Sequence, residues 1–332
     1  MRAAVLSGVG AHLPDKVVTN DDLSAVLDTS DEWIRTRTGI VQRHVALPSE
    51  TSLHLGVEAG RVALKSSGSS DVDAVVCATT TPHRMCPGTA PEIASRLGLP
   101  QVGAFDVQAV CSGFVYGAAV AAGLIAAGIA DRVLLVATES IVRFIDPEDR
   151  NTAVIFGDGA GAVVLRAGDA DEAGALGSFD LGSDGEVSDL IKVDAGASLV
   201  PPGTTDGATR SHYLEMDGRE VYRRAIPTMV ASSRKVLAAR GWAVDDIDVL
   251  VGHQANVRIL NAVARDLGLP EERCYVNIDR VGNTAAASIP LALADAQAAG
   301  ALKPGDKVLI TAFGGGITWG STTVVWPELP AV

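Results

Sequence analysis

The chain has 332 residues, of which 47% are hydrophobic and only 4% aromatic, and its formal net charge is −13. This length allows about two domain-sized units and is ample for a buried core. A strongly acidic chain is poorly suited to bind nucleic acid, so that class of function is disfavoured. The four cysteines form no C-x-x-C pair, which argues against a zinc ribbon or a redox pair. The low cysteine count and the lack of a signal-peptide pattern predict a cytoplasmic protein.

Strand-like and helical segments alternate along the chain. In the first half we expect strands at Arg2–Gly8, Ala74–Thr79, Val102–Val107, Val133–Ala137 and Ala162–Leu165, and helices at Ser52–Lys65, Ala90–Leu97 and Ser112–Ala127. In the second half we expect strands at Val249–Gly252, Tyr275–Ile278, Val308–Ala312 and Ser321–Trp326, and helices at Arg219–Ala239, Val257–Leu267 and Thr284–Ala299. This alternation predicts an α/β fold with crossover units and mostly parallel sheets.

One long segment, residues 107–130, contains no charged residue and is long enough to cross a membrane. It is rich in Gly and Ala, and Asp131, Arg132 and an apolar strand follow it at once. We therefore expect a helix that is buried on all sides, in a protein that does not insert into membranes.

The two halves of the chain also resemble each other. The segment 71–77 is similar to 246–252, and the helix that begins near Cys111 has a counterpart near Thr284. Such self-similarity predicts two duplicated α/β halves, residues 1–170 and 218–332. Residues 171–217 lie between them and are expected to form an excursion, because 183–217 is rich in Gly, Pro, Ser, Thr and Asp.

Cys111 is the first candidate for chemistry, because it lies where a strand-like run gives way to a helical one. Unpaired N–H groups and the helix dipole favour an anion at such a junction. We therefore expect a lowered thiol pKa and a nucleophilic thiolate. The alternative is an ordinary buried cysteine, and this segment alone leaves both interpretations open.

Two candidate partners lie in the second half. His253 follows the strand 249–252, and Asn283 precedes the predicted helix from Thr284. Each also has a structural interpretation, as a core histidine and as a helix N-cap. Because parallel strands build sites at their carboxyl ends, the duplication would bring both residues toward Cys111. A Cys, His and Asn group is typical of nucleophilic acyl transfer.

Ordered motifs along nearly the whole chain carry a family resemblance. They are Asp28-Thr29-Ser30-Asp31-Glu32-Trp33-Ile34, Arg37-Thr38-Gly39-Ile40, Phe105-Asp106 with Cys111, Phe156-Gly157-Asp158-Gly159-Ala160-Gly161, Gly252-His253-Gln254-Ala255-Asn256, Gly282-Asn283-Thr284 and Phe313-Gly314-Gly315-Gly316. Together they resemble β-ketoacyl-acyl-carrier-protein synthase III, a family of thiolase-fold condensing enzymes. The resemblance implies a five-layered α-β-α-β-α core, a homodimer, and a role in starting fatty acid synthesis.

The resemblance also implies a mechanism. Cys111 takes the acyl group of an acyl-CoA, and malonyl-acyl-carrier protein then loses carbon dioxide and attacks the acyl-enzyme. His253 and Asn283 donate hydrogen bonds to the malonyl thioester oxygen, while the backbone N–H groups of Cys111 and Gly315 form the oxyanion site of acyl transfer. No metal or cofactor is implied. The matching motifs provide no second cysteine or carboxylate as a base, which favours decarboxylative condensation over thiolase or hydroxymethylglutaryl-CoA synthase chemistry.

Substrate-binding residues follow from the same resemblance. Trp33, Arg37 and Arg150 match positions that hold the adenine end of CoA, and Asn256 matches a contact to the pantetheine arm. An acidic carrier protein would need a local basic patch on this acidic chain. The candidates are Arg223, Arg224, Arg258 and Arg265, although Asp266 lies beside Arg265 and charged helix faces are usually just solvated.

The sequence leaves open which acyl group the protein accepts. Phe313 and Cys86 are expected at the acyl pocket, and Cys86 stands where some family members place a bulky aromatic residue that closes the pocket across the dimer. We therefore expect branched or longer acyl-CoA to be accepted, unless the 183–217 segment fills the space. A starter-unit enzyme of a polyketide-type pathway, or one that only transfers acyl groups, is an alternative. A non-catalytic thiolase-fold subunit is disfavoured, because such subunits lack the nucleophile.

Overall fold

The computed structural model describes residues 2–99, 101–201 and 212–330, so that 202–211 of the expected excursion lie outside it. The N-terminal half forms a five-stranded mixed sheet. In spatial order its strands are β1 (Arg2–His12), β7 (Gly159–Asp169), β6 (Arg132–Glu139), β4 (Ala74–Ala78) and β5 (Gly103–Val107). The pairs β4–β5 and β4–β6 are parallel, whereas β6–β7 and β1–β7 are antiparallel.

A four-stranded sheet of the same design takes three strands from the C-terminal half and one, β8, from the expected excursion. In spatial order its strands are β8 (Asp180–Ser183), β13 (Thr318–Val325), β12 (Lys307–Gly314) and β11 (Val249–Gly252). The pairs β8–β13 and β12–β13 are antiparallel and β11–β12 is parallel, which repeats the pairing of β1, β7, β6 and β4. The predicted predominance of parallel pairs is wrong, because β6 and β12 are each followed by a neighbouring strand without an α-helical crossover.

One predicted strand, Tyr275–Ile278, does not form. Cys274 makes a single parallel bridge to Leu250, and α8 (Ile278–Val281) begins four residues later. The side chain of Gln254 satisfies the intervening backbone, because its Nε2 donates to the Tyr275 carbonyl at 3.1 Å and its Oε1 accepts from the Asn277 N–H at 3.1 Å. These backbone groups therefore need no neighbouring strand.

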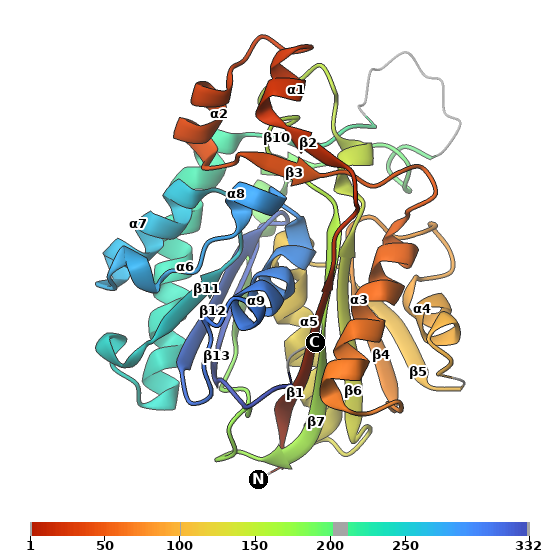
Figure 1. Cartoon of the computed structure of the whole chain (residues 1–332), viewed down its shortest axis with the longest axis vertical. Helices are drawn as coiled ribbons and strands as arrows, with labels where there is room; N and C mark the ends of the chain where they lie inside the picture. Colours follow the sequence, from red (N-terminus) through yellow and green to blue (C-terminus); the bar gives the residue numbers. More distant parts are fainter. Residues whose placement is uncertain (1, 100, 202–211, 331–332) are drawn as a thin grey trace.

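Helices complete five layers, which Figure 1 shows side by side. The outer layers are α3 (Ser52–Ser67) with α4 (Ala90–Arg96) on the N-terminal sheet, and α6 (Gly218–Arg240) with α7 (Val257–Leu267) on the C-terminal sheet. Between the sheets lie α5 (Gly113–Ala126) and α9 (Ser288–Ala298), whose apolar side chains pack on both sheets. The predicted five-layered thiolase-type core is confirmed.

The uncharged segment contributes α5 to the central layer, but the prediction that it is buried on all sides is wrong, because Gly123 and Ala126 near its C-terminal end are exposed. Among the described residues, no helix has the length and apolar character needed to span a membrane. Because α5 packs between two sheets, its hydrophobic sequence reflects burial within the fold.

Shorter elements cover one end of the two sheets, at the top of Figure 1. They are β2 (Val17–Thr19), α1 (Asn20–Ser24), α2 (Asp31–Thr38), β3 (Gln42–His44), β9 (Ile191–Lys192) and β10 (Glu215–Met216). The last two pair with each other and belong to the excursion. Strand β4 and its parallel neighbours end toward this side, so these elements stand over the region where the candidate residues meet.

Candidate active site

Cys111 lies between β5 and α5, in a short 3-10 turn that spans Val110–Ser112. Val110 has a φ of 45°, a left-handed conformation that is unusual for a β-branched residue. Such strain persists only where the surrounding structure holds it, and it is common at functional sites. The turn places the Cys111 side chain against the C-terminal half, although only 7% of the residue is exposed.

The predicted lowering of the Cys111 pKa is wrong for the free protein. Burial, and after it the negative charge of Glu139, raises the pKa of Cys111 to about 12. The backbone N–H groups of Cys111 and Gly315 favour the thiolate, but their effect is smaller. The loss of hydration outweighs the helix terminus, so at neutral pH the resting side chain is a thiol that must lose its proton during the reaction.

The glycine run after β12 brings backbone directly to this thiol. A Cβ at Gly314 would lie 2.7 Å from the Cys111 nitrogen and 2.9 Å from the Ser112 nitrogen, so no larger side chain is compatible with this approach. The N–H of the next residue, Gly315, then reaches Cys111 Sγ. The two backbone groups expected at an oxyanion site are therefore found at the nucleophile.

His253 follows β11 and is buried, with 3% of its surface exposed. Burial lowers the pKa of His253 to about 3, so the imidazole is neutral throughout the physiological range. Its Nδ1 lies 2.7 Å from the Ser288 hydroxyl, which also accepts from the Gln254 N–H at 3.4 Å. A hydroxyl can donate one hydrogen bond and accept two, so it can donate to Nδ1 while it accepts from Gln254, which leaves the proton of a neutral imidazole on Nε2.

Asn283 precedes a turn that the sequence did not predict. The helix expected from Thr284 begins at Ser288 instead, because Ala285 has a φ of 47° and residues 285–287 form a 3-10 turn. The Ala285 N–H donates to Asn283 Oδ1 at 2.9 Å. This bond fixes the orientation of the amide, so that its NH₂ group is directed away from the turn.

One cavity of about 120 Å³ brings the three predicted residues together. Cys111, His253 and Asn283 line it, with Phe313 and Asn256. The rest of its wall is largely apolar, and Ile191, Leu214 and Met216 from the excursion contribute to it. The excursion therefore fills part of the space beside the nucleophile, which is the possibility that the sequence left open for the 183–217 segment.

Sequence reasoning missed Glu139, a wholly buried carboxylate at the end of β6. It accepts from the Thr80 N–H at 3.0 Å and from the Thr81 hydroxyl at 2.6 Å. Burial nevertheless raises the pKa of Glu139 to about 7, and its charge acts on Cys111. Glu139 does not line the cavity, so it lies behind the nucleophile and is not placed to take a proton from a substrate. Its position after a parallel strand was the signal that could have found it.

Trp33, Arg37 and Arg150 form one group beside this region. The guanidinium carbons of Arg37 and Arg150 lie 4.5 Å and 5.3 Å from the centre of the Trp33 ring. Asn256 caps α7, and its Nδ2 donates to the Arg37 carbonyl at 2.9 Å. Because Asn256 also lines the cavity, it connects the aromatic group to the nucleophile site.

The four arginines expected to bind a carrier protein lie on α6 and α7, which pack together. Arg223 and Arg224 both pair with Glu220, at 2.6 Å and 2.7 Å, and Arg265 pairs with Asp266 at 3.4 Å. Arg258 instead lies over the ring of Tyr222, 5.7 Å from its centre, and no acidic partner of it is found among the described residues. Neighbouring carboxylates therefore reduce much of this patch's positive charge.

Cys86 is exposed and does not line the cavity of Cys111. Cys86 was expected to contact the acyl group of the other subunit across a dimer, so the role of Cys86 in the acyl pocket stays a prediction.

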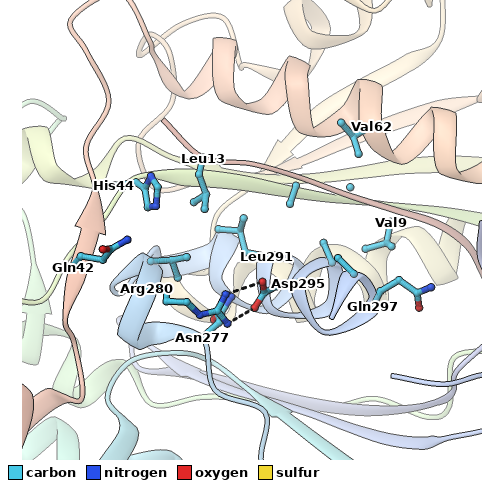
Figure 2. Close-up of a pocket in the computed structure, with 15 residues that line it drawn as sticks. Val9, Leu13, Gln42, His44, Val62, Asn277, Arg280, Leu291, Asp295 and Gln297 are labelled. Atoms are coloured by element: carbon cyan, nitrogen blue, oxygen red, sulfur yellow. Dashed lines mark hydrogen bonds and ion pairs between the residues drawn. The ribbon is translucent and has the colours of Figure 1, made fainter. Parts of the chain in front are cut away.

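A second and larger cavity, of about 590 Å³, lies between β1 and α3 on one side and α8 and α9 on the other. Figure 2 shows the Arg280–Asp295 ion pair, at 2.7 Å, facing His44 and Leu13 across it. None of the residues predicted to act in catalysis lines this cavity. We therefore assign the chemistry to the smaller one.

Comparisons with known proteins agree with this geometry. The family description 3-oxoacyl-(acyl-carrier-protein) synthase III matches residues 105–185, and that of its C-terminal part matches 237–326. β-Ketoacyl-acyl-carrier-protein synthase III 3 of Streptomyces coelicolor is 53% identical over 100% of this chain and 99% of its own.

Solved structures give the same result. That of 3-oxoacyl-(acyl carrier protein) synthase III from Pseudomonas aeruginosa has a TM-score of 0.93 and 50% identity, and covers 99% of both chains. The priming β-ketosynthase of the R1128 polyketide biosynthetic pathway has a TM-score of 0.91 and 34% identity, over 99% of this chain and 98% of its own. The chain therefore belongs to the β-ketoacyl-acyl-carrier-protein synthase III family, and it is an enzyme of this type.

Proposed function

We propose that the protein condenses an acyl-CoA with malonyl-acyl-carrier protein, with loss of carbon dioxide, to give a 3-oxoacyl-acyl-carrier protein and start fatty acid synthesis. The observation that carries this proposal is the shared cavity of Cys111, His253 and Asn283. It combines a nucleophile with two oriented hydrogen-bond donors, which is what this reaction requires. The acyl-CoA is a substrate, and neither half of the reaction needs a cofactor.

In the loading step, Cys111 Sγ forms a bond to the thioester carbonyl carbon and the CoA thiolate leaves with a proton. Because the thiol pKa is about 12, a group in the cavity must accept the thiol proton as that bond forms. His253 is neutral and can do so when Nδ1 carries the hydrogen and Nε2 does not, although burial, which lowers its pKa to about 3, opposes a full transfer before the bond forms. The Ser288 hydroxyl supports both tautomers, since it can donate to Nδ1 or, after rotation, accept from it.

In the condensation step, the bond between the malonyl carboxylate and its methylene carbon breaks and carbon dioxide leaves. The electron pair develops as an enolate, whose oxygen accepts from His253 Nε2–H and from the Asn283 amide. Each such donor contributes about 3 kcal/mol to lowering the barrier. The methylene carbon then bonds to the acyl carbon, and Cys111 leaves as a thiolate.

Intact-protein mass spectrometry with a panel of acyl-CoA thioesters tests the loading step. We expect one acyl adduct, on a peptide that contains Cys111, and its absence in Cys111→Ala. Discharge of that adduct by malonyl-acyl-carrier protein, with release of carbon dioxide, tests the condensation. Loading without such discharge would show plain acyl transfer instead.

CoA recognition is proposed at Trp33, Arg37 and Arg150. Arginine stacks on flat rings and pairs with phosphate, so the group suits an adenine nucleotide that carries phosphates. Asn256 would then contact the pantetheine arm on its way to Cys111. For the carrier protein we retain the α6–α7 arginines, with Arg258 as the principal cation because acidic neighbours pair with the others.

We also propose a homodimer that pairs along β5, and a location in the cytoplasm. Strand β5 is an open edge of its sheet, and Phe105 is 39% exposed there. The loop that carries Cys86 borders this edge, because the Asp106 carboxylate accepts from the Thr89 N–H at 2.6 Å. Light scattering of Phe105→Glu should report a monomer. The four cysteines are free thiols, as a reducing compartment would keep them.

A second candidate function is that of a starter-unit ketosynthase in a polyketide-type pathway. The structural likeness to the R1128 priming ketosynthase favours it. The identity of the best acyl adduct distinguishes the two, since Cys86 in place of a bulky aromatic residue leads us to expect branched or longer starters. Strict preference for acetyl-CoA would contradict that expectation.

A further inference from the structure

We propose that His12, Glu50 and His54 form a binding site for a divalent transition-metal ion of the Zn²⁺ type, separate from the catalytic cavity. One ligand atom of each side chain can be chosen so that all three lie within 4.8 Å of one another. The two imidazole rings face each other edge to plane, with centroids 5.9 Å apart and an interplanar angle of 79°. None of the three residues lines the cavity of Cys111.

The histidine on the strand supplies the second observation. His12 Nε2 is buried and has no hydrogen-bond partner. A buried polar atom without a partner costs about 1–3 kcal/mol, so such an atom in a native fold needs an explanation. A metal ion would supply the missing partner, because a neutral imidazole nitrogen is the commonest protein ligand for transition metals.

The surrounding charge favours a cation. The carboxylates of Glu50, Glu58 and Asp15 all act electrostatically on His12. Glu50 is held in place through one oxygen, Oε2, which accepts from the Leu47 N–H at 2.8 Å, and its other oxygen is available as a ligand. The site therefore offers two nitrogen donors and one oxygen donor in a region of negative potential.

The backbone keeps these donors at a fixed separation. His12 is the last residue of β1, and His54 lies in the first turn of α3. A Cβ at Gly10 would lie 2.3 Å from the Ala63 nitrogen, so the strand that ends at His12 and the helix that carries His54 are in direct backbone contact. The three donors lie within 4.8 Å of one another, and a tetrahedral zinc site would draw them closer, to about 3.3 Å.

The donor set selects the kind of metal. Two imidazoles and a carboxylate suit Zn²⁺, Co²⁺ and Ni²⁺, whereas Mg²⁺ and Ca²⁺ prefer oxygen ligands throughout. Three protein ligands leave a fourth position for water. Metal bound here would clamp the end of β1 to the start of α3. It would also adjoin Thr51, whose hydroxyl lies 3.0 Å from His83 in the loop that carries Cys86.

Calorimetric titration of the chelator-treated full chain with ZnCl₂ tests the site. We expect one Zn²⁺ ion per chain, binding about 100-fold more weakly in His54→Gln, whose exposed side chain can be changed without disturbing the core. His12→Gln and Glu50→Gln should weaken binding as well. His212→Gln, an exposed histidine outside the site, should bind as the parent does.

The absorption spectrum of bound Co²⁺ identifies the ligand atoms. We expect d–d bands of a nitrogen and oxygen site, without the intense near-ultraviolet band that a thiolate ligand adds. Unchanged binding in His54→Gln, a thiolate band, or no binding at all would each overturn the proposal. The result is independent of the condensing activity, since the site contains no residue assigned to catalysis.

Discussion

Replacing Glu139 by Gln removes a buried charge behind the nucleophile and keeps the shape of the side chain. The folded protein holds the pKa of Glu139 at about 7, against an ordinary value of 4.5. At about 1.4 kcal/mol for each pH unit, this difference corresponds to about 3 kcal/mol. The folded state binds the extra proton, so the stabilisation is fully present below pH 4.5 and is lost as pH rises through about 7.

Urea unfolding of the two proteins at pH 5 and pH 8.5 measures this effect. Relative to Glu139→Gln, the parent should lose about 3 kcal/mol of unfolding free energy between these pH values. Cys111 should also react faster with iodoacetamide in the variant at pH 8.5, because the negative charge that raises the thiol pKa is gone. The exposed Glu148→Gln serves as the control and should change neither quantity.

Equal pH dependence in the parent and Glu139→Gln would refute the reasoning. It would mean that Glu139 keeps an ordinary pKa in the folded state, and that burial alone sets the reactivity of Cys111. If the pH dependence of stability changed as expected but the alkylation rate did not, Glu139 would have a raised pKa without affecting the Cys111 thiol. That result would refute only the coupling of Glu139 to Cys111.

Three further outcomes follow from the site. Ser288→Ala should lower the rate of malonyl decarboxylation about tenfold, because it removes the hydroxyl that holds His253 Nδ1, and acyl loading measured alongside should fall less. An unchanged decarboxylation rate would contradict the role of Ser288 in orienting the His253 Nε2–H. Trp33→Ala should raise the KM for acyl-CoA about tenfold with little change in kcat, since stacking contributes about 1–2 kcal/mol, whereas a pure kcat defect would exclude this CoA position. Arg258→Glu should weaken turnover that depends on the carrier protein and spare loading from CoA in the mass assay; an equal loss of both would remove Arg258 from the docking surface.

The layered fold was largely predictable from sequence, because apolar strands and helices of regular period dominate it. The failed strand at Tyr275–Ile278 shows where such patterns stop working. Its residues are apolar enough for a strand, but the side chain of Gln254 takes up the backbone hydrogen bonds. Contacts between residues 21 and 23 positions apart in sequence leave no periodic signal.

The candidate site was predicted through resemblance more than through local pattern. Cys111, His253 and Asn283 gather in one cavity, but the Cys111 pKa was expected to fall and it rises. The helix terminus was visible in sequence, whereas the burial of the thiol and the charge of Glu139 exist only after folding. The same holds for Ser288, since its contact with His253 depends on a 3-10 turn that precedes α9.

The central claim is that Cys111 carries an acyl group that malonyl-acyl-carrier protein then takes by decarboxylative condensation. Its most direct measurement is a single-turnover experiment on the acyl-loaded enzyme, which follows the Cys111 adduct by mass and carbon dioxide release together. We predict that the adduct disappears as one carbon dioxide is released and one 3-oxoacyl-carrier protein forms, and that Asn283→Ala retains the adduct. Loss of the adduct without carbon dioxide or 3-oxoacyl product would contradict this account.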